Sequence, residues 1–140
     1  MEEFDKVNIT KIVKMALIKT GVRCDLTGFS YLSTAIELAI EKPVLCQRLC
    51  KGLYAEVGKI YSIENESCVE RSIRHAIDTT FNQKTFEGIN EMFGVELFSA
   101  YDKPTAGELI KLIVEYYNLG LYKKDIKFKT ETNKLMEKTC

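Results

Sequence analysis

Residues 67–81 carry a row of side chains that could hydrogen-bond to the edges of DNA bases. Arginine offers a planar fork of donors that matches the two acceptors of guanine, and glutamate can accept from the amino group of cytosine. A row of such groups at the start of a helix is what reading the major groove requires. The row consists of Ser67, Arg71, Arg74 and Asp78, with Glu70 and His75 flanking it.

The same row has a simpler interpretation as the solvated face of a helix. Glu70 and Arg74 are four residues apart, which is the spacing of an ion pair along one helix. Charged faces of this kind greatly outnumber faces that read DNA. The spacing by itself therefore favours the solvated face, and a second observation is needed to select the base-reading interpretation.

The helix that must position this row is predicted by its opposite side. Core-type residues recur there at helical spacing and indicate one buried stripe, which consists of Val69, Ile73, Ala76, Ile77, Thr80 and Phe81. Two caps are available at the start of the helix: Asn65 alone, or Ser67 with Glu70 as a capping box. The capping box would compete with base reading for Glu70, and the sequence leaves both caps open.

The second observation is a resemblance carried by two segments, VERSIRHAI (residues 69–77) and KPTAGELI (residues 103–110). Both resemble the effector domain of the stage zero sporulation protein A family, the master response regulator of entry into sporulation. The resemblance extends from about Ile9, through ITKIVKMALIKTGV and GFSYLSTAI, to about Leu119. The string VER-x-IRHAI is far more specific than a general helix-turn-helix pattern, and it selects the base-reading interpretation.

The resemblance implies that residues 67–82 form a recognition helix in the major groove of double-stranded DNA. The family places the two arginines and the glutamate of this helix against the base edges of a short operator box. It places the serine and the histidine close to the phosphate backbone. The DNA-binding residues implied in this way are Ser67, Glu70, Arg71, Arg74 and His75.

Lys103 precedes the last predicted helix, and the resemblance makes it a candidate phosphate clamp. The amide groups at a helix N-terminus also favour phosphate, although a plain surface lysine is nearly as good an interpretation. In the family, a phosphorylatable receiver domain precedes this domain and controls dimerisation. The 140 residues contain no receiver, so the chain is either an excised effector domain or a free-standing effector, and we expect the second. The further partners that we expect are a sigma factor of RNA polymerase and a second copy of the chain on tandem sites.

The apolar spacing along the chain predicts an all-α fold, a compact bundle of six or seven short helices that contains a helix-turn-helix. Thr27 and Gly28 are interpreted as loop residues, and Pro104 as a first-turn residue of the last helix. We expect one domain over residues 1–120 and a Lys-rich extension over residues 121–140 that packs against it. The predicted helices cover residues 9–20, 29–41, 44–62 in two pieces, 67–81, 85–93 and 104–119, with 54–61 as the first helix of the helix-turn-helix.

The overall charge gives no sign of a general affinity for nucleic acid. Lysine and arginine number 20, aspartate and glutamate number 20, and the net charge is zero. Because non-specific DNA affinity rests on neutralising phosphates, a basic patch on this protein must be local. No apolar run is long enough to cross a membrane and the first residues do not resemble a secretory signal, so we expect a cytoplasmic protein without a membrane partner.

The five cysteines are an odd number without a paired framework, which favours reduced thiols. Cys46, Cys50, Cys68 and His75 could be imagined as a zinc site. However, Cys46 and Cys50 fall in the apolar stripe of residues 44–57, where core packing is the better interpretation. The chain also has one histidine and neither a Gly-rich phosphate loop nor a Ser/His/Asp arrangement. We therefore expect no enzymatic activity, no cofactor and no metal.

The rival function is a protein-interaction module of the same fold that modulates the full-length regulator without binding DNA. The zero net charge supports it, and so does Cys68, where the family commonly has an arginine that could contact phosphate. A third option is a thiol- or metal-based sensor at Cys68. The presence of Glu70, Arg71 and Arg74 favours DNA binding over both alternatives.

Overall fold

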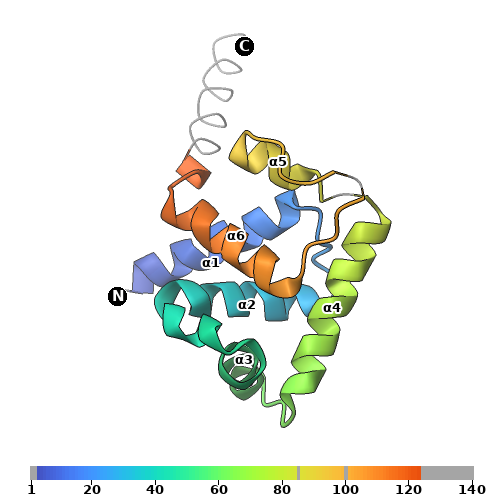
Figure 1. The fold of residues 1–140 in the computed structure, drawn as a ribbon. Coiled ribbons are helices and arrows are strands. Elements are labelled where there is room, and N and C mark those ends of the chain that lie inside the picture. The colour runs from blue at the N-terminus through green and yellow to red at the C-terminus, as the bar shows by residue number, and fades with distance from the viewer. Residues whose placement is uncertain (1–2, 85, 100, 124–140) are drawn as a thin grey trace, which may run out of the picture.

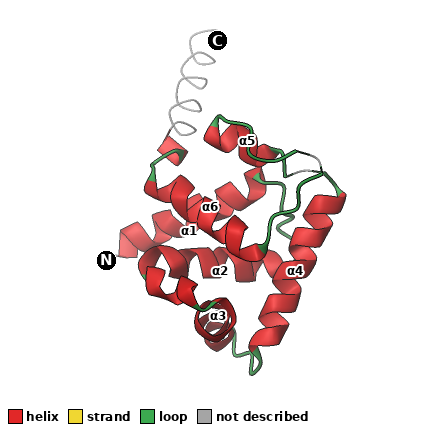
Figure 2. Cartoon of the chain, viewed as in Figure 1, coloured by secondary structure: helices red, strands yellow, loops and turns green. Residues whose placement is uncertain are grey.

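The computed structural model of the chain describes residues 3–84, 86–99 and 101–123, and these contain six α-helices and no strand (Figures 1 and 2). The prediction of an all-α bundle is therefore confirmed. The helices are α1 (Glu3–Lys19), α2 (Thr27–Glu41), α3 (Ala55–Ile60), α4 (Glu66–Asn82), α5 (Gly88–Phe93) and α6 (Ala106–Asn118).

Helix α2 lies at the centre of the bundle, because α1, α4 and α6 all pack against it (Figure 1). The buried side chains of these helices form one continuous apolar core, and removing that surface from water is the main term that stabilises such a fold. Large side chains that are fully buried in this core include Leu17, Leu32, Ile36, Leu53, Tyr54, Ile73, Leu109, Ile110 and Ile113. The recognition helix predicted from the sequence is thus packed against the central element of the bundle.

The prediction that Thr27 and Gly28 are loop residues is wrong. Helix α2 begins at Thr27, and Gly28 is buried where α2 crosses α4. A methyl group at Gly28 would overlap the backbone carbonyl of Ser72 and lie 2.8 Å from the Cβ of Ala76. The glycine therefore permits a close approach of two helices and does not break one. Helix α1 is also longer than predicted, beginning at Glu3 and not near Ile9, because apolar spacing marks only the part that packs.

Residues 43–54 form two short helices that are not α-helical, where the sequence predicts α-helix. Pro43–Gln47 is a 3-10 helix, Leu49–Tyr54 is a π-helix, and α3 follows directly. Gly52 sits in the second of these helices, where a Cβ would lie 2.9 Å from the carbonyl oxygen of Leu45. This geometry corrects one side-chain prediction: Cys46 is partly buried, but Cys50 is exposed and does not fill the core.

The last two helices end where their glycines predict but begin later than expected. Gly94 and Gly120 have positive φ angles of 70° and 71°, which favour glycine, and they follow α5 and α6. Helix α6 begins at Ala106 with Thr105 as its N-cap, whose hydroxyl accepts from the amide of Glu108 at 3.1 Å. Pro104 therefore lies before the cap and not inside the first turn. The predicted extension lies outside the described residues beyond Lys123.

Candidate nucleic-acid interface

Helix α4 has the two faces that its sequence predicts. Val69, Ile73, Ala76, Ile77 and Thr80 are buried, and Phe81 is partly buried. On the other side, five residues are exposed: Ser67, Cys68, Arg71, Arg74 and His75. The exposed side chains are therefore held in fixed positions by a face that cannot turn away from the core.

Asn65 caps helix α4, which settles the choice of cap. Its side-chain oxygen accepts from the amide of Ser67 at 3.0 Å and from the hydroxyl of Ser67 at 2.7 Å. Side-chain acceptors at this position satisfy amide groups that have no partner within the helix. Because Asn65 does this, the Glu70 carboxylate is not needed for capping.

The turn between α3 and α4 is tied to the rest of the molecule by contacts that the sequence analysis missed. The hydroxyl of Tyr61 lies 2.8 Å from that of Thr34 and donates to the carbonyl of Ser30 at 3.3 Å. The Tyr61 ring also meets the ring of Tyr31 edge-on, with centroids 5.0 Å apart. No sequence signal pairs residues about thirty positions apart, so these contacts could be found only in the folded chain.

A second tie connects the π-helical turn to the start of α4. The ammonium group of Lys51 donates to the carboxylate of Glu66 at 2.9 Å. The hydrogen bond from Lys51 lowers the pKa of the Glu66 carboxyl, and the same bond raises the pKa of Lys51. The Lys51 side chain is exposed and that of Glu66 is partly exposed, so solvent screens the pair and it adds little to stability. It does place one positive charge beside the first turn of α4.

The charged residues of the exposed row differ in whether they are already paired. Arg74 lies 3.5 Å from the Glu70 carboxylate, as the solvated-face interpretation expects. Arg71 has no ion-pair partner among the described residues. Its side chain is exposed on the same face. Of the two arginines, Arg71 is therefore the one whose donors are available without breaking another contact.

Lys103 reaches α4 from the segment before α6. Its ammonium group forms an ion pair with Asp78 and lies 6.0 Å from the centre of the Phe81 ring. The side chains of Lys103 and Asp78 are 46% and 41% exposed, although the carboxylate oxygen that meets Lys103 is itself buried. The structure thus brings Lys103 to the row of residues 67–78, where a carboxylate partly neutralises it.

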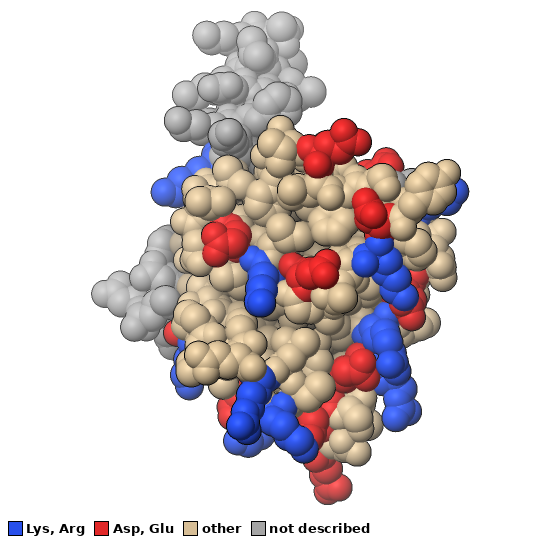
Figure 3. Space-filling view, in the orientation of Figure 1, with Lys and Arg blue, Asp and Glu red and all other residues tan. Residues whose placement is uncertain are grey.

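The surface around α3 and α4 mixes both signs of charge. Figure 3 shows Lys and Arg side chains along the edge formed by α4 and around the end near α3, with acidic side chains among them. Such a surface has only a small basic excess, whereas strong non-specific binding usually requires a large one. The charged residues of this region are Arg48, Lys51, Lys59, Arg71, Arg74, Lys84 and Lys103, with Glu56, Glu64, Glu66, Glu70 and Asp78.

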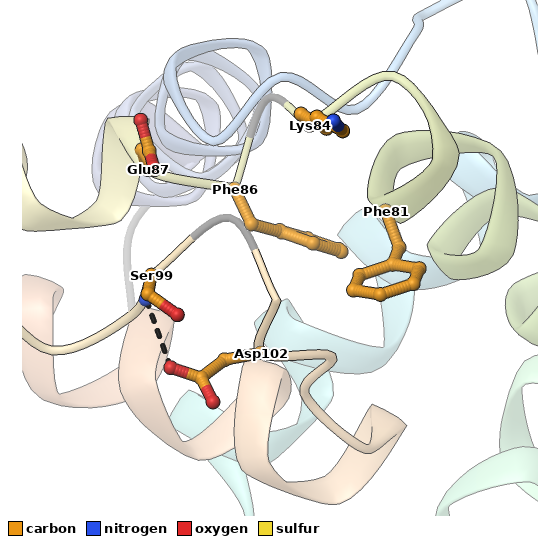
Figure 4. A pocket seen from close by; sticks show the side chains of 6 residues that line it. All are labelled: Phe81, Lys84, Phe86, Glu87, Ser99 and Asp102. Carbon is orange, nitrogen blue, oxygen red and sulfur yellow. Dashed lines mark hydrogen bonds between the residues drawn. The ribbon is translucent and has the colours of Figure 1, made fainter.

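A small hollow lies at the C-terminal end of α4, and it is too small for a cofactor. It is an open depression without enclosed space, whereas a ligand pocket is a cleft or cavity that buries most of its ligand. The rings of Phe81 and Phe86 face one another there, and the Asp102 carboxylate accepts from the amide of Ser99 at 2.8 Å (Figure 4). The Asp102 carboxylate is thus held by the backbone of its own loop.

The described part of the chain offers neither a metal site nor a membrane-spanning helix. Within it, no group of three or more histidine, cysteine, aspartate or glutamate residues is arranged to hold a metal ion. Nor is any described helix both long and apolar enough to span a membrane. The exposed face of α4 with its neighbours therefore remains the candidate site.

One comparison with known protein families bears on this face. The family model described as "Sporulation initiation factor Spo0A C terminal" matches residues 13–117. The match covers three quarters of the 140 residues. It includes α2 to α5 in full, all of α6 except its last residue, and residues 13–19 of α1. Every element that positions the exposed face therefore lies within or overlaps it.

Proposed function

The chain belongs to the family of the C-terminal domain of sporulation initiation factor Spo0A, and from this premise we propose that it is a sequence-specific DNA-binding transcription regulator. The family is one of DNA-binding effector domains and not of enzymes. We propose that α3 and α4 act as the helix-turn-helix and that α4 lies in the major groove. The target is a duplex that carries the operator box of the family.

The observation that carries this proposal is the exposed face of a helix whose other face is buried throughout. Arg71 stands unpaired on that face among the described residues, next to Arg74 and Glu70. A recognition helix needs fixed donors and acceptors that a base edge can approach. We assign Arg71, Arg74 and Glu70 to base edges, and Ser67, His75 and Lys103 to phosphates.

We further propose that the protein acts in the cytoplasm and binds tandem boxes as a homodimer. A sigma factor of RNA polymerase is the protein partner that this role requires for activation. These proposals rest on the family and on the DNA-binding function, so they require that function to be tested first.

A fluorescence titration with two labelled duplexes tests the function. One duplex carries the family-type box and the other a scrambled sequence of equal length and composition. We expect tighter binding to the box across a range of salt concentrations, because base contacts add to the shared phosphate contacts. Equal affinity for both duplexes would contradict sequence-specific binding.

The mixed charge of the α3–α4 surface gives the rival function its own support. A protein-interaction module of the same fold needs no basic patch, and the acidic residues among the lysines and arginines would repel phosphates. No binding to either duplex at low salt would favour this rival. Binding at low salt that disappears at moderate salt on both duplexes would leave only non-specific attraction.

Changing Asp78 to asparagine should strengthen binding to any duplex. The change removes a negative charge from the DNA-facing row and releases Lys103 from its ion pair. One additional phosphate contact should steepen the dependence of log affinity on log salt by about one. Stability should change by no more than about 1 kcal/mol, because both side chains are partly exposed. Titrations at several salt concentrations measure the slope.

The matched control for this variant is Asp25→Asn. The Asp25 carboxylate lies 2.6 Å from the guanidinium group of Arg23 in the loop between α1 and α2. The control variant therefore removes the same charge from another part of the surface. If the Asp78 variant shows the salt slope of the wild type, Lys103 does not contact phosphate.

A further inference from the structure

Lys51 is an exposed lysine whose partner belongs to the first turn of the recognition helix. Its ammonium group donates to the Glu66 carboxylate at 2.9 Å, and its side chain is 76% exposed. The two residues are 15 positions apart, so the tertiary fold and not a local turn brings them together. A carboxylate offers a lysine the same negative charge and the same kind of acceptor oxygen as a DNA phosphate. Lys51 is thus already engaged with an anion at the start of α4.

The place of Lys51 in the fold is where a helix-turn-helix meets the DNA backbone. Its π-helix, Leu49–Tyr54, leads directly into α3 and packs against α4. In this motif the second helix lies in the major groove and the first crosses the phosphate backbone. With α4 in the groove, an exposed lysine at the beginning of the first helix can reach a phosphate. Its flexible four-carbon stem allows the ammonium group to move from one anion to another.

The other end of α4 has the same arrangement. Lys103 also comes from another segment, and it also pairs with a carboxylate of α4, that of Asp78. Glu66 and Asp78 are separated by about 18 Å along the helix axis, because each residue of an α-helix adds about 1.5 Å. Two ammonium groups held at points so far apart cannot share one phosphate. The two lysines are therefore suited to contact two different phosphates, one at each end of α4.

We propose that Lys51 is a further phosphate-binding residue, at the end of α4 opposite to Lys103, and that Glu66 competes with DNA for it. On binding, a phosphate oxygen takes the place of the Glu66 carboxylate, so the lysine exchanges one anionic partner for another. The contact then gains less than a free lysine would gain. The DNA backbone alone therefore binds weakly, and base contacts decide where the protein stays. This inference rests on the proposed DNA-binding function.

The variant Lys51→Met tests the inference, because it nearly keeps the length of the side chain and removes its charge. Its affinity should fall on the box duplex and on the scrambled duplex alike. The slope of log affinity against log salt should become shallower by about 0.9, the share of one phosphate contact. Between about 50 and 200 mM salt, the wild type should therefore lose about 3.5-fold more affinity than the variant. The thermal unfolding temperature should change little, because solvent screens the lost pair.

Lys11→Met is the matched control, because Lys11 is exposed on α1, which packs against α2, α5 and α6. This control should leave the salt slope unchanged. The double variant Lys51→Met/Lys103→Met should lose about 1.8 from the slope, because two separate phosphate contacts are removed. Glu66→Gln should strengthen binding to both duplexes. It should do so less when Lys51 is methionine, because part of its effect is the release of that lysine.

Three results would overturn the inference: an unchanged salt slope in the Lys51 variant, the same reduction in the Lys11 variant, or a double variant whose slope equals that of Lys103→Met alone. A wild-type protein without preference for the box would instead overturn the proposed function. The wild-type titration thus tests the function, and the difference between the slopes tests the role of Lys51.

Discussion

Replacing Arg71 with alanine should weaken binding to the box duplex by about 10- to 100-fold, equivalent to about 1–3 kcal/mol for one bidentate contact to a base. Arg71 is exposed on α4 and has no ion-pair partner among the described residues. Its loss therefore removes an interaction with DNA without freeing another charge in the protein. Preference at one base position should be lost with it, which titration against single-base variants of the box will show.

The matched control for Arg71→Ala is Arg23→Ala, which removes the same charge from the loop between α1 and α2, where Arg23 pairs with Asp25. This control should lower box affinity only as much as the loss of one distant positive charge does. It should leave the preference for the box over its single-base variants intact. If both arginine variants lose affinity equally on box and scrambled duplexes, Arg71 contributes only its charge. The assignment of base reading to α4 would then be wrong.

Replacing Gly28 with alanine should destabilise the whole fold, by at least about 1–3 kcal/mol as overpacked cores are. The added methyl group would overlap the backbone carbonyl of Ser72, so the α2–α4 crossing must open. A backbone carbonyl cannot rotate away as the end of a flexible side chain can. Because α2 anchors the recognition helix, we also expect weaker DNA binding at temperatures where the variant is still folded. Thermal and urea unfolding measure the first effect.

Gly107→Ala provides a control of the same chemistry. Gly107 lies in the first turn of α6, and a methyl group there would meet only the Cδ2 of Leu49, at 3.8 Å. Alanine is the better helix former by about 0.5–1 kcal/mol, so this variant should be slightly more stable than the wild type. Equal stability of the two variants would show that the α2–α4 crossing tolerates the methyl group.

The local spacing of apolar residues and of capping residues allowed the helices to be predicted without a structure. The buried stripe from Val69 to Thr80 and the cap candidate Asn65 lie within a few residues of one another, and both are confirmed. Where tertiary contacts override local preference, the prediction was wrong. Gly28 lies in the first turn of α2, where the backbone of Ser72 comes too close for any side chain. Pro43–Tyr54 forms a 3-10 helix and a π-helix that pack against α2 and α4.

By itself, the sequence determined that residues 67–81 form a helix with one apolar and one charged face, because helical periodicity is a property of neighbours along the chain. The local spacing already indicates the pair of Glu70 with Arg74. Only the tertiary structure decided which charges from other segments reach that face: it pairs Asp78 with Lys103, and it leaves Arg71 without an ion pair within the described residues. Partners such as Lys103 come from another segment, and no local pattern encodes which distant side chain folding will bring to a given charge.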